Sequence, residues 1–143
     1  MPPLACVTRV VSFAAAHRMH SPALSGHDNL ALYGKCNSRN GHGHNYKVEV
    51  TVRGQVDPTT GMVLNLSVLK DCMQRAILDV MDHRNLDLDV PYFKDKVSTA
   101  EVIAVFIWEQ MLVHLPKSDT YALHQVRLHE TDNNIVTFSG EYS

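Results

Sequence analysis

Residues 44–53, HNYKVEVTVR, alternate apolar and polar side chains, and this alternation constrains the fold more than any other feature of the sequence. Successive side chains of a β-strand point to opposite faces, so the alternation predicts a strand that is buried on one side only. The residues expected on the buried side are Tyr46, Val48, Val50 and Val52.

A second strand is expected near the start of the chain, over residues 7–18. Between the two strands, residues 21–43 are rich in Ser, Gly, Asn and Asp, which is the composition of a loop. Residues at alternate positions of a strand share one face, and in the first strand these are Val11, Phe13, Ala15 and His17.

The end of the chain predicts another pair of strands, at residues 123–130 and 135–138, with residues 132–134 as the turn between them. A short strand is also expected at residues 62–64, after the turn-forming sequence DPTTG. Strands therefore occur on both sides of the middle of the chain.

Two helices are expected in that middle part. Asn65 can cap the first helix, whose apolar residues recur at helical spacing. The second follows Ser98-Thr99-Ala100-Glu101, the S-x-x-E pattern of a capping box, and ends before Pro116. The apolar positions are Leu66, Leu69, Met73, Ile77 and Val80 in the first helix, and Val102, Val105, Phe106, Trp108 and Leu112 in the second.

The order ββααββ indicates an α+β fold, with a mainly antiparallel sheet and two helices on one face. The chain has 143 residues, which is within the size of one ordinary domain, and it contains no linker, so we expect a single domain over residues 1–143. A sheet of about four strands leaves two unpaired edges, which copies of the chain can cover by closing a barrel. We therefore expect an oligomer.

The composition excludes several classes of protein. Hydrophobic residues make up 45% of the chain and the net charge is −2, with no basic block, so nucleic acid and anionic membranes are not expected partners. The opening MPPLAC lacks the regions of a signal peptide, and no apolar stretch is long enough for a bilayer. Three cysteines without CxxC spacing fit reduced thiols, so we expect a cytoplasmic protein.

Nine histidines are many for this length, and two of them, His42 and His44, are two positions apart in NGHGHNY. If the strand begins early enough, both imidazoles lie on one face and can chelate one Zn²⁺. His17 ends the first strand on the face of Phe13 and Ala15, and is the candidate third ligand. A three-histidine site without a fourth protein ligand suits a catalytic zinc, although such a pair of histidines also occurs on ordinary strands.

Other residues are candidates for proton transfer and substrate binding. Cys36 lies in a loop beside Lys35, and a neighbouring cation or metal lowers the pKa of a thiol, although an incidental thiol is the commoner case. Asp82 and His83 close the first helix, where the acid can orient the imidazole, or where both can be ordinary polar residues. Glu130 has the parity of the preceding apolar strand residues, and a carboxylate there can bind a guanidine-like ligand edge, or can mark the point where the strand meets solvent.

The chain resembles the 6-pyruvoyl tetrahydropterin synthase family. The resembling segments occur in the family's order and span nearly the whole chain. They are SFAAAHR, LYGKCNSRNGHGHNYKVEVTVRG, DPTTGMVLNLSVLK, DHRNLD, VPYF, STAEVIAVFIW and ETDNNIV.

This resemblance implies the tunnelling fold, a ββααββ unit that forms trimers and stacks as a homohexamer with active sites between subunits. It implies conversion of 7,8-dihydroneopterin triphosphate to 6-pyruvoyl-tetrahydropterin with loss of triphosphate, in tetrahydrobiopterin biosynthesis, with one zinc ion per subunit and no nicotinamide or flavin. The implied site residues are His17, His42 and His44 for zinc, Cys36, Asp82 and His83 for proton transfer, and Glu130 with Thr99 for the pterin.

Three alternatives remain open from the sequence. One is 6-carboxy-tetrahydropterin synthase, a relative with the same fold, zinc ligands and substrate, although the spacing C-N-x-x-N-G-H-G-H-N resembles the pyruvoyl enzyme more. The second is a zinc-dependent pterin-binding module without turnover, and the third is a purely structural zinc protein. Ala100 replaces a threonine that is usual in the family, and residues 117–124 form a longer segment than usual. Lys35 and Arg39 can contact the triphosphate, but solvated loop charge is the commoner role of such residues.

Overall fold

The computed structural model describes residues 1–143, and its main elements are four strands and three longer helical segments. The strands are β1 (Leu4–His17), β2 (His42–Gln55), β4 (Tyr121–His129) and β5 (Ile135–Phe138), with a two-residue β3 (Arg84–Asn85). The helices are α1 (Gly26–Tyr33), α2 (Leu66–Met73), α3 (Asp79–Met81), α4 (Leu86–Asp89) and α5 (Ala100–His114).

The strands form one sheet in the order β3-β1-β2-β4-β5. β1 and β2 pair antiparallel over their full length, so that Phe13 lies opposite Tyr46 and His17 opposite His42. The expected alternation is confirmed, because Val48 and Val50 are fully buried whereas Lys47 is exposed. β3 pairs parallel to β1, so the sheet is mixed and the order ββααββ describes only its larger elements.

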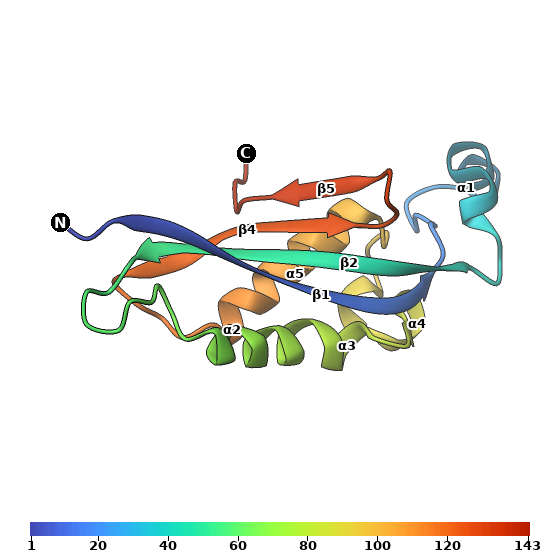
Figure 1. Cartoon of the computed structure of the whole chain (residues 1–143). Helices are drawn as coiled ribbons and strands as arrows, with labels where there is room; N and C mark the ends of the chain where they lie inside the picture. Colours follow the sequence, from blue (N-terminus) through green and yellow to red (C-terminus); the bar gives the residue numbers. More distant parts are fainter.

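One face of this sheet carries the long helices. Figure 1 shows the strands as a layer with α2, α3 and α5 packed against it, and α1 apart from them beyond the end of β1 and β2. A single cluster of 28 buried hydrophobic residues fills the space between sheet and helices. The prediction of two helical segments on one face is therefore confirmed, with α2 and α3 joined into the first of them by a π-helical stretch, Gln74–Leu78.

The two helix caps differ in how well the sequence predicted them. Asn65 caps α2 as expected, since its side chain accepts a hydrogen bond from the Ser67 N–H. The capping box at the start of α5 is wrong: Thr99 is the capping residue and accepts from the Val102 N–H. Ser98 is fully buried instead and donates its hydroxyl hydrogen to Asp87.

Two further expectations are wrong. Residues 21–43 are not only a loop, because they contain α1, capped by the Ser25 side chain, and a 3₁₀ helix, Gly34–Asn37. Residues 62–64 are not a strand, and Val63 and Leu64 are buried without a β partner.

None of the helices combines the length and apolar character that crossing a bilayer requires.

Candidate functional site

Three histidines meet where β1 and β2 end their pairing. His17 is the last residue of β1, and His42 and His44 are the first and third residues of β2, on the same face. One ring nitrogen from each lies within 4.8 Å of the others, and the Nε2 atoms of His17 and His42 are 3.0 Å apart. The strand parity seen in the sequence therefore brings the three predicted ligands together.

Hydrogen bonds fix the orientation of His17. Its Nδ1 lies 2.6 Å from the carbonyl oxygen of Ser98. A carbonyl can only accept, so Nδ1 carries the hydrogen and Nε2 presents a lone pair to the cluster. Ser98 is held in turn by donating to Asp87 Oδ1 at 2.6 Å, and Asp87 Oδ2 accepts from the Arg18 N–H at 2.7 Å. A ring fixed through its second nitrogen is typical of metal-ligating histidines.

The other two histidines are half-buried, and their surroundings favour the neutral imidazole. Burial, followed by the charge of His17, lowers the pKa of His42. Burial also lowers the pKa of His44, while the carboxylate of Glu130 acts in the opposite direction. Neutral imidazole is the form that binds a metal ion, so the electrostatics of the cluster fit a ligand set.

The spacing of the nitrogens can be compared with a tetrahedral zinc site. Zn–N bonds of ~2.0–2.1 Å at a tetrahedral angle separate two ligand nitrogens by about 3.3–3.4 Å. The separations in the cluster, 3.0 Å for one pair and none above 4.8 Å, need only small side-chain movements to reach that value. With three neutral nitrogens and no thiolate, the residues present fit a metal held by three histidines with an open fourth position.

Two features of β1 and β2 hold the histidines at this spacing. Tyr46 is fully buried, stacks on Phe13 with ring centroids 4.9 Å apart, and contacts His44 edge-on at 5.5 Å. Gly41 precedes His42 with φ +75°, and a Cβ added there would lie 2.8 Å from the backbone oxygen of His17. Only glycine allows the chain to enter β2 this close to the end of β1.

Cys36 lies in the 3₁₀ helix after α1 and is half-buried. Its carbonyl oxygen accepts a hydrogen bond from the Met19 N–H at 2.9 Å, which ties this helix to the chain just beyond His17. Asn37 adds a second tie by donating to the Met19 carbonyl at 2.8 Å. The structure therefore brings the backbone of Cys36 to the end of β1, close in the fold to the histidine cluster.

Asp82 and His83 follow α3 and form a pair, with 3.0 Å between Asp82 Oδ1 and His83 Nδ1. Asp82 Oδ1 also accepts from the Ala14 N–H, and this hydrogen bond is the main cause of a lowered pKa for Asp82. The His83 side chain is 84% exposed, and its backbone has a left-handed φ of 62°. No hydrogen bond joins either residue to Cys36 within the chain.

Glu130 and Thr99 line one cavity of about 410 Å³ between the end of β4 and the start of α5. Glu130 is half-buried, and its charge acts on the pKa of both His42 and His44, so it lies near the histidine cluster. The fold therefore brings these two residues, which are 31 positions apart in the sequence, to the wall of one cavity.

Two residues of the site were missed from the sequence. Ser98 matched a capping pattern, so the sequence did not indicate its contact with His17. No sequence pattern distinguishes a buried serine next to a helix start from a serine that caps the helix. Asp87 accepts one hydrogen bond from the N–H of Arg18, 69 positions earlier, and another from the Ser98 hydroxyl, and no local pattern marks the first of these contacts.

Comparison with known proteins shows that the sequence is similar to one family over nearly its whole length. The sequence model of the family described as 6-pyruvoyl tetrahydropterin synthase matches residues 6–141. The chain is 58% identical to the 6-pyruvoyl tetrahydrobiopterin synthase of Poecilia reticulata over 94% of the chain and 90% of that protein. It is 56% identical to the human protein of the same name, over 94% of the chain and 91% of the human protein.

A solved structure is similar over nearly the whole chain. The 6-pyruvoyl tetrahydropterin synthase of Caenorhabditis elegans superimposes with a TM-score of 0.93 at 46% identity, covering 98% of both chains.

Proposed function

The chain belongs to the 6-pyruvoyl tetrahydropterin synthase family, and we propose that it is a zinc-dependent lyase of tetrahydrobiopterin synthesis. The proposed reaction converts 7,8-dihydroneopterin triphosphate to 6-pyruvoyl-tetrahydropterin and releases triphosphate. The observation that carries the proposal is the cluster of His17, His42 and His44 beside the carboxylate of Glu130.

His17, His42 and His44 would hold the zinc ion. A zinc ion bound there acts as a Lewis acid, which lowers the pKa of hydroxyl groups on the substrate side chain. The chain contributes the fixed tautomer of His17 and the partly dry surroundings of the other two rings, both of which support the proposed ligand set.

Glu130 would anchor the pterin. The amino-pyrimidine edge of a pterin presents two adjacent N–H donors, which match the two oxygens of one carboxylate. Thr99 lines the same cavity. Its hydroxyl oxygen accepts from the Val102 N–H, and this leaves the hydroxyl hydrogen available for donation to a ligand. Together they would orient the ring so that its side chain extends towards the histidines.

Cys36 would move protons between the carbons of the substrate, with Asp82 and His83 adjusting the protonation of the site. The reaction is an internal redox change, since the side chain loses the two hydrogens that the ring gains, and triphosphate leaves with the bonding electrons. No external oxidant or reductant is required. This balance agrees with a site made only of acid–base groups and metal ligands.

A complete site would need more than one copy of the chain. Within one chain, Asp82 and His83 hydrogen-bond to each other and to Ala14, not to Cys36. β3 pairs with only two residues of β1, so most of that edge of the sheet and the edge of β5 are open, and copies can extend the sheet into a barrel. We therefore propose a homohexamer made of two trimers, in which Asp82 and His83 of one copy complete the site of another.

Product analysis tests the proposed reaction. The purified protein with zinc and 7,8-dihydroneopterin triphosphate should release triphosphate and yield 6-pyruvoyl-tetrahydropterin, identified by mass spectrometry. Formation of acetaldehyde and a 6-carboxy pterin would instead assign the chain to the carboxy branch of the superfamily. Binding of the pterin with no product would leave only a binding module.

A further inference from the structure

A second cavity, of about 440 Å³, opens directly beyond the histidine cluster and carries an unusual concentration of positive charge. Its wall includes Arg18, the residue after His17, and Gly41, the residue before His42. Adjacent residues have Cα atoms ~3.8 Å apart, so the cavity begins one residue from two of the three proposed metal ligands. The cationic residues that line it are Arg18, Arg39, Lys94 and Lys96.

These cations are not neutralised by carboxylates within the chain. Arg39 and Lys94 form no ion pair, and Lys96 has only the exposed Asp95 at 3.4 Å. Asp87 is the one carboxylate of the cavity wall, and both of its oxygens accept other hydrogen bonds, from Arg18 N and Ser98 Oγ. The cavity therefore has a net positive charge that an anion can neutralise.

Two donors of the cavity are also held in place. Arg18 Nε donates to the Asn37 carbonyl at 2.9 Å, which fixes the guanidinium without supplying a negative charge. The Asn37 amide donates to Met19 O and lies 3.0 Å from His20 Nδ1, so that this ring nitrogen must accept. The His20 hydrogen is then on Nε2, which makes the ring a donor. Fixed donors of this kind suit phosphate oxygens.

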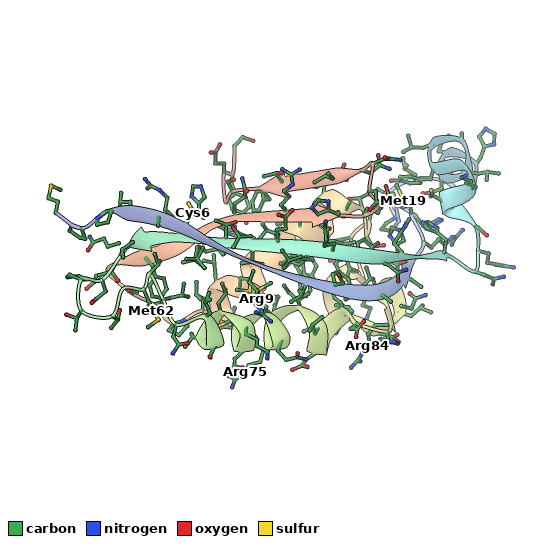
Figure 2. The ribbon with its side chains drawn as sticks, viewed as in Figure 1. Cys6, Arg9, Met19, Met62, Arg75 and Arg84 are labelled. Atoms are coloured by element: carbon green, nitrogen blue, oxygen red, sulfur yellow. The ribbon has the colours of Figure 1, made fainter.

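The cavity and the pterin pocket lie on opposite sides of one short segment. Met19 lines the cavity of Glu130, whereas its neighbours Arg18 and His20 line the basic cavity. Figure 2 shows Met19 at the end of the sheet nearest to α1, where β1 has left its pairing with β2. A carboxylate pocket, a metal cluster and a basic cavity thus follow one another around the end of β1.

We propose that the basic cavity binds the oligophosphate tail of the substrate, an inference that rests on the proposed function. A pterin bearing a side-chain triphosphate carries its groups in the same order as the chain presents their partners: ring edge, hydroxyls, phosphates. Arg39, Lys94 and Lys96 are specificity residues of this cavity, and Arg18 and His20 are its fixed donors.

Inorganic triphosphate is the direct probe. Calorimetric titration of the full-length protein should give a Kd that rises about tenfold or more in the triple variant Arg39→Ala, Lys94→Ala, Lys96→Ala, because each lost cation removes a charge-assisted contact. The matched control removes three exposed cations elsewhere: Lys70, Arg75, which points away from the sheet in Figure 2, and Lys117. Equal affinity in the wild type and the cavity variant would overturn the proposal.

Steady-state kinetics separates the tail of the substrate from a free anion. In the cavity variant the KM for dihydroneopterin triphosphate should rise by a similar factor with kcat and zinc content unchanged, while binding of unphosphorylated dihydroneopterin stays the same. Inorganic triphosphate that binds without competing with the substrate would contradict the assignment to the tail. If the wild type forms no product at all, the proposed reaction fails, but the titration still decides whether the cavity binds oligophosphate.

Discussion

The histidine cluster and the candidate acid–base residues are positioned by different kinds of structure. His17, His42 and His44 lie on two strands that pair residue by residue, and one chain is sufficient to bring their nitrogens together. Cys36 lies in a short 3₁₀ helix and the Asp82–His83 pair follows α3, and no hydrogen bond joins them within the chain. Under the proposed function, one folded subunit would hold the metal ion, whereas proton transfer would require residues from two copies of the chain.

The largest expected effect is on the strand-built part. His42→Ala should lose the bound zinc and reduce turnover by about a thousandfold or more, since a Lewis acid contributes several kcal/mol to a transition state. Zinc content by plasma emission spectrometry, measured beside activity, tests this. His124→Ala is the control, because His124 is exposed on β4 and lies outside the cluster. Full zinc occupancy in His42→Ala would remove His42 from the ligand set.

Cys36→Ala should separate the two parts of the site. The variant should lose about 10²- to 10⁴-fold in kcat, the range for a lost general acid or base, and keep its zinc and its affinity for the pterin. The exposed Cys6 provides the control Cys6→Ala, which should retain wild-type kcat. Undiminished turnover by Cys36→Ala would mean that another group transfers the proton.

Glu130→Gln should affect binding more than chemistry. The neutral amide can accept only one of the two pterin hydrogen bonds, so the KM should rise by about 10- to 100-fold, with zinc content unchanged. Glu101→Gln is a matched control, because Glu101 lines the same cavity from α5 but is exposed. A change in kcat alone would place Glu130 in the chemistry and not in the anchoring of the ring.

Ser98→Ala should have the smallest effect. The variant loses the hydrogen bond from Ser98 Oγ to Asp87, which we expect to cost about 1–2 kcal/mol in the free energy of unfolding. His17 keeps its contact with the Ser98 backbone carbonyl, so zinc should remain bound. Urea unfolding measures the cost, with the exposed Ser67→Ala as reference. Loss of zinc in Ser98→Ala would show that the hydroxyl also orients His17.

The difference between residues on paired strands and residues in irregular segments also explains what could be predicted from the sequence. Strand alternation is a local pattern with a fixed consequence, so the parity of His17 with Phe13 predicts the face on which His17 lies. The pairing of β1 with β2 then places it opposite His42. Helix α1 was missed because its residues, GHDNLALY, lack an apolar stripe and bury only Asn29. The prediction of a strand at residues 62–64 is wrong because a strand requires a neighbouring strand to pair with, and none lies beside these residues.

The start of α5 shows a second limit. Ser98 and Thr99 can both cap a helix, and the sequence pattern favoured the serine. In the fold, His17 and Asp87 bind Ser98, so Thr99 takes the cap. Competition between a local pattern and contacts from 81 residues away can be resolved only with the structure.

Mixed oligomers test most directly whether the acid–base part of the site is shared between copies. Cys36→Ala and His83→Asn each should be inactive alone; asparagine is chosen because it tolerates the left-handed backbone at His83. Co-expressed in equal amounts, they should recover about one quarter of the wild-type activity, since random assembly leaves that fraction of two-chain sites intact. Mixed oligomers confirmed by native mass spectrometry but still inactive would contradict a site shared between chains.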